Sequence, residues 1–177
     1  INVENDIVPY RGGRFYFTAA KTRRNGLELS FNLKSKFNFD IFSSFTYSSN
    51  KYVDYTVDSI HYNKPNKFAN YSGNFVAGIP NLFYNVGLNY SLNSFYGFYS
   101  TITLQTVSEY FVDDANKIKV PDFSIVNFSI GFNQLSVAGI KIYTSFSINN
   151  LFNKKYVASA FINPDVINNE PYYIEPG

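Results

Sequence analysis

The sequence predicts an all-β fold built from antiparallel hairpins, and composition is the first reason. Phe and Tyr make up 20% of the 177 residues, while Cys, Met and Trp are absent. Aromatic and β-branched residues favour strands because they fit a pleated, half-buried surface. The second reason is that apolar and polar residues alternate over long segments, with the period of two that places successive side chains on opposite faces of a strand.

The first predicted hairpin covers residues 26–48. Apolar residues occupy every second position of its first strand, and the alternation resumes at Phe37 after a turn of one or two residues at positions 35–36. The segment before Gly26 is predicted to continue the first strand upward, and residues 1–8 to end the strand before it. The apolar positions are Leu27, Leu29, Phe31 and Leu33, then Phe37, Phe39, Ile41, Phe45 and Tyr47.

Two further hairpins follow the same pattern. They pair residues 82–92 with 98–105 and residues 126–132 with 140–148, through short connections at 93–97 and 133–139. The segments between hairpins are long and polar, and they cover residues 50–80, 110–121 and 161–177. Short turns that alternate with long loops, joined by strands of about 10 residues, are typical of outer-membrane barrels.

A soluble β-sandwich is the alternative, because it also contains hairpins with alternating residues. One parity of the predicted strands is bulky and aromatic along its whole length. The opposite parity is small and neutral, where a soluble surface would carry more Lys and Glu. No window approaches the ~18 consecutive apolar residues of a membrane-spanning helix, so contact with a membrane would require a barrel. The pattern favours the barrel and leaves the sandwich open.

Few residues suggest chemistry. His61, the single histidine, lies in the first long loop, and Asp113, Asp114 and Lys117 lie in the second. These are candidate ligand contacts, and neither loop has the residue spacing of a metal site. No catalytic constellation is visible, so no enzyme and no cofactor are predicted. The net charge of +2, with scattered Lys and Arg, gives no reason to expect a nucleic-acid partner.

Four charged residues fall on the polar parity of their strands. A charged side chain that faces lipid near the midplane would cost on the order of 2–4 kcal/mol, so a barrel would turn all four toward its lumen. They are Glu28, Lys34, Asp40 and Lys141.

Four phrases of the sequence together resemble one family. They are KTRRNGLELSF (21–31), SEYFVDDANKIKVPDFSIVNFSIGF (108–132), INNLFNKKYVAS (148–159) and EPYYIEPG (170–177). In this order they resemble the C-terminal part of the TonB-dependent outer-membrane receptors, particularly those that take up ferric-iron complexes. The resemblance covers nearly the whole chain. Its most specific positions, expected to be structural, are Gly26, Glu28, Asn150, Leu151, Phe152 and Tyr156.

The resemblance implies a barrel of about 22 strands with a plugged lumen, of which this chain would hold about seven antiparallel strands. Residues 1–177 would be the C-terminal part of the barrel domain, without the plug domain and the last strand. The implied function is uptake of a siderophore-like ferric complex across a Gram-negative outer membrane. The implied partners are the plug, TonB through a region outside this chain, the ferric complex and outer-membrane lipid. The alternative function is adhesion or binding by a small β-barrel or soluble β-sandwich.

The last regular strand raises a separate question, because two asparagines follow it. Counting from the short turn, we expect the strand to reach the outer membrane interface near residues 147–150 and to continue as the barrel rim. Leu151, Phe152 and Tyr156 are then expected to pack at the headgroup level or against neighbouring strands.

Overall fold

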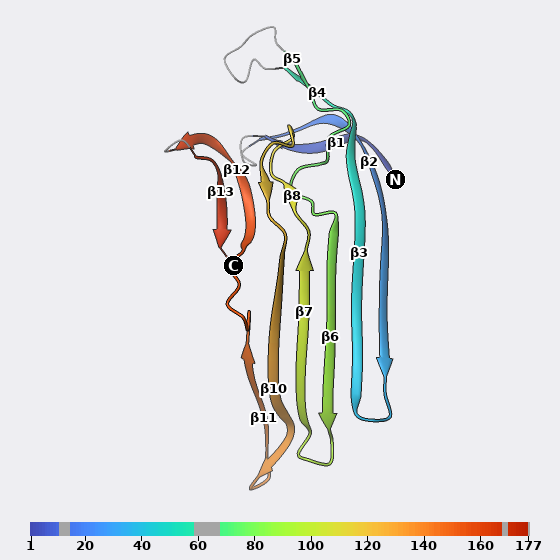
Figure 1. The fold of residues 1–177 in the computed structure, drawn as a ribbon, viewed down its shortest axis with the longest axis vertical. Helices are drawn as coiled ribbons and strands as arrows, with labels where there is room; N and C mark the ends of the chain where they lie inside the picture. The colour runs from blue at the N-terminus through green and yellow to red at the C-terminus, as the bar shows by residue number, and fades with distance from the viewer. Residues whose placement is uncertain (11–14, 59–67, 168–169, 177) are drawn as a thin grey trace.

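The computed structural model describes residues 1–10, 15–58, 68–167 and 170–176. Its main sheet has seven antiparallel strands in the order β1-β2-β3-β6-β7-β10-β11 and is not closed (Figure 1). The strands are β1 Asn2–Tyr10, β2 Phe15–Lys34, β3 Phe39–Asp54, β6 Leu82–Leu92, β7 Phe98–Val107, β10 Phe123–Val137 and β11 Ile140–Ile148. The predicted all-β antiparallel fold with seven wall strands is thus confirmed.

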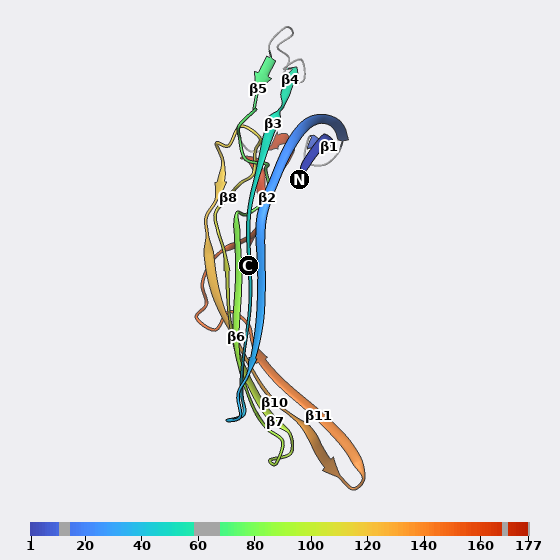
Figure 2. The same ribbon diagram turned by 90° about the vertical axis from the view of Figure 1, so that its right-hand side faces the viewer.

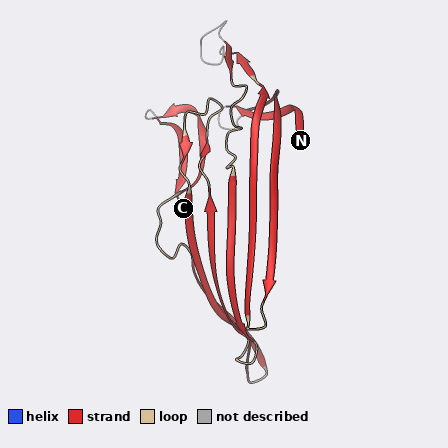
Figure 3. Cartoon of the chain, turned by 45° about the vertical axis from the view of Figure 1, so that its right-hand side comes forward, coloured by secondary structure: helices blue, strands red, loops and turns tan. Residues whose placement is uncertain are grey.

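Three small two-stranded sheets lie toward the upper end of the main sheet in Figure 1. They are β4 Thr56–Asp58 with β5 Phe68–Asn70, β8 Tyr110–Phe111 with β9 Lys119–Val120, and β12 Val157–Ile167 with β13 Glu170–Pro176. The described residues contain strands and loops only (Figure 3). None of them forms a helix long and apolar enough to cross a membrane.

All three predicted hairpins form, with two corrections at their turns. The first turn is longer than predicted: β3 begins at Phe39, so Phe37 belongs to the turn, and Asn38 adopts a φ of 66°. A left-handed conformation suits Asn, whose short polar side chain tolerates it. The predicted connection 133–139 is mostly strand, because β10 continues to Val137 and the turn is Ala138 and Gly139.

A β-bulge explains why β10 continues past the predicted strand end. The register between β10 and β11 shifts between Phe132 and Leu135, so β10 contains one extra residue there. The amides of Asn133 and Gln134 donate to the carbonyls of Gly97 and Tyr96 at 3.0 and 2.9 Å. The neighbouring 93–97 turn therefore binds the bulge through two backbone hydrogen bonds, a contact between separate segments that alternation does not reveal.

The main sheet has one apolar and one polar face, as the alternation predicts. The register pairs Leu29 with Phe45, Phe45 with Tyr84, and Leu88 with Ile102, so the apolar residues of successive strands share a face. This apolar face is open: the exposed fractions on β2 run from 53% at Leu27 to 60% at Leu33. Figure 2 shows the sheet nearly edge-on as a single layer. A sandwich would bury this face under a second sheet, so the sandwich alternative does not describe these residues.

Aromatic rings form a row across the turn end of the apolar face. The ring centroids are 4.6 Å apart for Phe39 and Tyr90, 6.4 Å for Tyr90 and Phe98, and 5.6 Å for Phe98 and Phe132. Phe95, in the 93–97 turn, adds contacts to Phe98 at 6.5 Å and Phe132 at 6.0 Å. Four neighbouring strands and one turn thus contribute to one row, which is the pattern of an aromatic girdle at a membrane interface.

Candidate functional site

A half-buried carboxylate of the second long loop binds the upper end of β3 and the start of the first long loop. The hydroxyls of Tyr52 and Tyr55 donate to Asp114 Oδ1 and Oδ2 at 2.7 and 3.0 Å. Tyr52 and Tyr55 are 3% and 2% exposed, and their ring centroids are 4.5 Å apart. We call Tyr52, Tyr55 and Asp114 the Tyr–Asp cluster. It joins positions about 60 residues apart in the sequence, so it ties the first loop to the second.

Asparagine side chains add a second set of links between the same loops. The backbone amide of Phe75 donates to Asn116 Oδ1 at 2.7 Å, and Asn116 Nδ2 donates back to the Phe75 carbonyl at 2.9 Å. Asn74 Nδ2 donates to the carbonyl of Asp114 at 2.8 Å. One amide side chain therefore satisfies both backbone groups of Phe75, as a neighbouring strand would.

Asp113 organises the turn of the second loop. Its Oδ1 accepts hydrogen bonds from the backbone amides of Lys117 and Ile118 at 2.9 and 2.8 Å. The carboxylate of Asp113 thus supports the turn, while the Lys117 side chain is exposed. Asp113 therefore stabilises its own turn, whereas Asp114 binds the two tyrosines outside its own loop.

The environment of Asp114 changes its acidity. Burial raises the pKa of the Asp114 carboxyl, and the hydrogen bonds from Tyr52 and Tyr55 lower it in part. The nearby charge of Asp113 adds to the increase. The net pKa of Asp114 lies above its ordinary value, so the folded loops favour its protonated form.

The predicted site residues lie in different parts of the molecule. Asp113, Asp114 and Lys117 lie together in the second loop, whereas His61 is outside the described residues. The four charged strand residues share the polar face, because the register pairs Glu28 with Thr46, Lys34 with Asp40, and Ser136 with Lys141, in phase across the sheet. Sequence reasoning missed Tyr52, Tyr55 and Asn116. The tyrosines near the end of β3 and the two aspartates of the second loop were visible in the sequence. Nothing in the sequence showed that these residues bind one another.

Gly26, the glycine of the first family phrase, allows β2 and β3 to approach closely. A Cβ at Gly26 would lie 2.6 Å from the carbonyl oxygen of Tyr47, closer than a carbon and an oxygen that are not bonded normally approach. Glu28 follows on the same face and is exposed opposite Thr46. A side chain at position 26 would therefore force the two strands to shift, and Glu28 leaves a carboxylate on the polar face.

The NNLFNKKY segment forms a turn that folds against β10. β11 ends at Ile148, as predicted, and Asn150 and Asn153 then adopt φ values of 52° and 49°. Asn150 Nδ2 donates to the carbonyl of Lys154, and the Lys154 amide donates to Asn150 Oδ1, both at 2.8 Å. The amide of Asn150 itself donates to Asn127 Oδ1 of β10 at 2.8 Å. Asparagine suits position 150 for two reasons. It tolerates a positive φ, and its side chain uses both the donor Nδ2 and the acceptor Oδ1.

The hydrophobic residues of this turn have different surroundings. The amide of Leu151 donates to the Val126 carbonyl at 2.7 Å, and the Tyr156 ring lies 4.3 Å from the Phe123 ring. The ring contact shows that the Tyr156 side chain packs against β10, whereas the Leu151 contact is a backbone hydrogen bond. Phe152 is 73% exposed.

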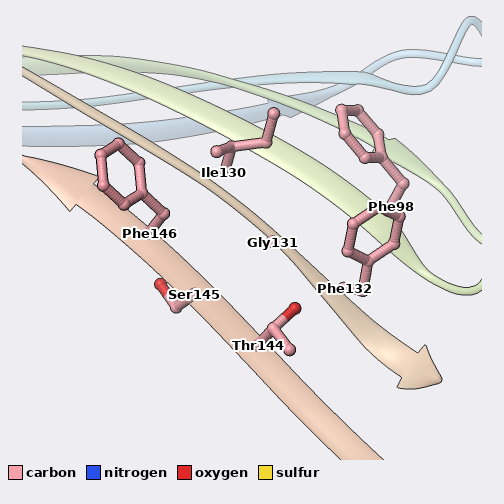
Figure 4. Close-up of a pocket in the computed structure, with 7 residues that line it drawn as sticks. All are labelled: Phe98, Ile130, Gly131, Phe132, Thr144, Ser145 and Phe146. Carbon is pink, nitrogen blue, oxygen red and sulfur yellow. The ribbon is translucent and has the colours of Figure 1, made fainter.

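A shallow hollow lies between β7, β10 and β11 (Figure 4). Phe98, Ile130, Phe132 and Phe146 line it from the apolar face. Its apolar lining does not suit a hydrated iron complex. The described residues also contain no group of three His, Cys, Asp or Glu side chains that could hold a metal ion.

These features define a segment of β-barrel wall. The sheet is open and has one aromatic, apolar face and one polar face, with short turns at one end and hydrogen-bonded loops at the other. The family model described as TonB dependent receptor-like, beta-barrel matches residues 1–151. The chain belongs to this family. Its relatives are transporters and receptors rather than enzymes.

Individual relatives are similar over much of the chain. The ferrichrome outer membrane transporter/phage receptor of Escherichia coli (strain K12) is 26% identical over 154 residues, which is 85% of this chain and 19% of that protein. The ferric yersiniabactin uptake receptor FyuA of Yersinia pestis superposes with a TM-score of 0.72 at 14% identity, covering 99% of this chain and 24% of the receptor. The siderophore receptor PiuA of Acinetobacter baumannii gives 0.70 at 17% identity, covering 99% and 23%. The chain therefore spans about a fifth to a quarter of these relatives' length.

Proposed function

We propose that this chain forms part of the wall and the extracellular loops of a Gram-negative outer-membrane receptor that takes up a ferric-iron complex, driven by TonB. The observation that carries this proposal is the match of residues 1–151 to the receptor barrel family. The open apolar face with its aromatic row supports it, because a face of this kind is stable in contact with lipid. The names of the relatives support a ferric siderophore as the class of substrate.

In this proposal the polar face lines the barrel lumen. Glu28, Lys34, Asp40 and Lys141 then face the plug domain or hydrated interior, where their charges remain solvated. The turns at 35–38, 93–97 and 138–139 lie on the periplasmic side. The long loops lie outside the cell.

Substrate capture in this proposal is noncovalent and needs no catalytic residue. The loop residues His61, Asp113, Asp114 and Lys117 lie on the side where the complex arrives. Asp114 and Asp113 act by holding the loops in place through the Tyr–Asp cluster and the turn, and Lys117 presents an exposed ammonium group. TonB would act through the plug.

Growth on defined iron complexes tests the proposal. The complete gene that encodes this chain is expressed in a bacterium that lacks its own ferric-siderophore receptors, with iron supplied as single complexes in separate cultures. We expect growth with at least one ferric siderophore and no growth when TonB is deleted. Failure on every complex despite correct insertion in the outer membrane, or growth that does not need TonB, would overturn the proposal.

A further inference from the structure

The polar face of the main sheet is uncharged over most of its height. On β3, β6, β7, β10 and β11 the charged residues of this face are Asp40 and Lys141, and both lie at the turn end of the sheet. Above that level the polar face of these strands presents hydroxyl, amide, apolar and aromatic side chains and glycine. This part of the wall is therefore electrically neutral toward the end that carries the long loops.

One row of side chains on this face lies about one membrane thickness above the aromatic row. The register pairs Glu28 with Thr46, and Thr46 with Phe83. Phe83 lies nine residues above Leu92, which pairs with Phe98 of the aromatic row. That distance is about 30 Å along a strand, and a tilt of about 40° reduces it to about 23 Å of height, close to the apolar band of an outer-membrane barrel. In the proposed function this row therefore lies at the outer mouth of the lumen.

The side chains at this level offer hydrogen bonds and apolar contact. In the next row down, Ser44 pairs with Asn85, and Asn85 pairs with Gln105. Both amide side chains are half-buried, and in the described part of the chain neither has a hydrogen-bond partner. Phe83 is 39% exposed. We call Glu28, Ser44, Thr46, Phe83, Asn85 and Gln105 the mouth wall.

The charges near the mouth wall do not favour an anion. Glu28 is exposed at this level. Arg24 lies four residues above it on the same face of β2, which is about 13 Å along the strand. Arg24 Nη2 and the Thr22 hydroxyl both donate to Asp6 Oδ2 at 2.6 Å, so the carboxylate of Asp6 compensates the charge of Arg24. An anionic complex would meet a carboxylate and no free cation at this level of the described strands.

We propose that the mouth wall selects an electrically neutral ferric complex, of the kind formed by three hydroxamate groups, over anionic catecholate or citrate complexes. The inference rests on the proposed function, which places the mouth wall where an incoming complex enters the lumen. Hydroxamate groups carry one negative charge each, so three of them balance Fe(III), whereas catecholates carry two each and leave an excess. Amide and hydroxyl groups hydrogen-bond to a neutral complex, and Phe83 contacts its apolar parts. An anionic complex needs cations to replace its hydration, and the mouth wall provides none.

The charge of the complexes that support growth is the first test. The complete gene is expressed in a receptor-deficient bacterium that retains inner-membrane uptake of each complex. Neutral hydroxamate complexes, including ferrichrome, and anionic complexes, including ferric enterobactin and ferric citrate, are supplied one at a time. We expect a neutral complex to support growth at the lowest concentration. Growth on anionic complexes alone, or at lower concentrations of them, overturns the inference and leaves the proposed function intact. Failure on every complex contradicts the proposed function instead.

Removing the aromatic ring tests the contact itself. Binding of the preferred neutral complex, labelled with radioactive iron, is measured on the complete receptor in nanodiscs. Phe83→Ala should weaken binding by about tenfold, which is the contribution of apolar contact with one large side chain. Ile102→Ala, on the apolar face, is the matched control and should leave binding unchanged. High salt should not change the affinity, because a neutral ligand is not screened. Unchanged binding by folded Phe83→Ala would overturn the contact.

Adding cations tests the charge preference. Ser44→Lys/Gln105→Lys should strengthen binding of ferric enterobactin by about fivefold for each added cation, and should change binding of the neutral complex much less. Ser91→Lys/Ser136→Lys adds the same charge at the turn end of the same face and should alter neither affinity. Equal affinities for ferric enterobactin in the wild type and in Ser44→Lys/Gln105→Lys, both folded in nanodiscs, would overturn the inference, because the wall would then not sense the charge of the complex.

Discussion

The main sheet and the loop cluster above it are specified in different ways. In the sheet, each face is set by a repeating pattern, and exchanging one apolar residue for another changes little. In the Tyr–Asp cluster, single atoms matter: the hydroxyl of Tyr52, at the end of β3, and that of Tyr55, just after β3, both donate to the carboxylate of Asp114 in the second loop. The wall should therefore tolerate variation within each face, whereas the loops depend on a few polar groups whose loss leaves their buried hydrogen-bond partners unsatisfied.

The largest expected effect comes from placing a charge on the apolar face. Leu29→Arg puts a guanidinium group on the side proposed to face lipid, which should cost about 2–4 kcal/mol of folding free energy near the bilayer midplane. Ser30→Arg, one residue away on the polar face, should cost little. Denaturant titration of the complete protein in lipid vesicles measures both. Equal destabilisation by the two variants would contradict the assignment of the faces.

A smaller effect is expected where the strands approach closely. Gly26→Ala places a Cβ 2.6 Å from the Tyr47 carbonyl oxygen, so the backbone must move. Overpacking of this kind costs about 1–3 kcal/mol. Ser30→Ala, on the same strand and face, is the control and should be nearly neutral. The same denaturant titration measures the difference, and a neutral Gly26→Ala would show that this motif glycine is not needed for pairing.

Breaking the loop contact should act locally. Asp114→Ala leaves the buried hydroxyls of Tyr52 and Tyr55 without their acceptor, at a cost of about 1–3 kcal/mol to loop closure. Hydrogen exchange of the amides in residues 68–78 and 110–120 should accelerate, while exchange in the main sheet stays unchanged. Asp122→Ala removes an exposed carboxylate from the same region and should alter neither. Faster exchange throughout the main sheet would show that opening of the loops is coupled to unfolding of the sheet.

The smallest expected effect is a dependence of the loops on pH. The pKa of Asp114 is raised in the folded state, chiefly by burial, so its protonated form is the one that folding favours. Loop closure should be most stable below the ordinary Asp pKa and should weaken as pH rises through the raised value. Asp114→Asn removes the titrating group, and its exchange protection should not vary with pH once intrinsic rates are corrected. Protection in the wild type that rises with pH would contradict this sign.

The sequence predicted the wall well because its information is local and repeated. Alternation around Leu29 and Phe45 set both the strands and their faces, and the end of β11 at Ile148 followed from the asparagines after it. One of the two errors at the turns was local, because Asn38 lengthens the first turn, and the other occurred where one segment contacts another. The bulge at Asn133 and Gln134 depends on the carbonyls of the 93–97 turn, a contact that alternation in β10 does not encode.

The candidate loop site shows the same division more strongly. Asp113 and Asp114 are adjacent residues of the same type, and the sequence analysis predicted the same role for both, a contact with ligand. The tertiary structure gives them different roles: Asp113 accepts hydrogen bonds from amides of its own turn, whereas Asp114 accepts hydrogen bonds from tyrosine hydroxyls at the end of β3 and just after it. The strands, their two faces and the alternation of short turns with long loops could be predicted from the sequence alone, because the period of two acts within each strand. The joining of the loops depends on the folded structure, because the hydrogen bonds of Asp114 and Asn116 reach residues about 40 to 60 positions away in the chain.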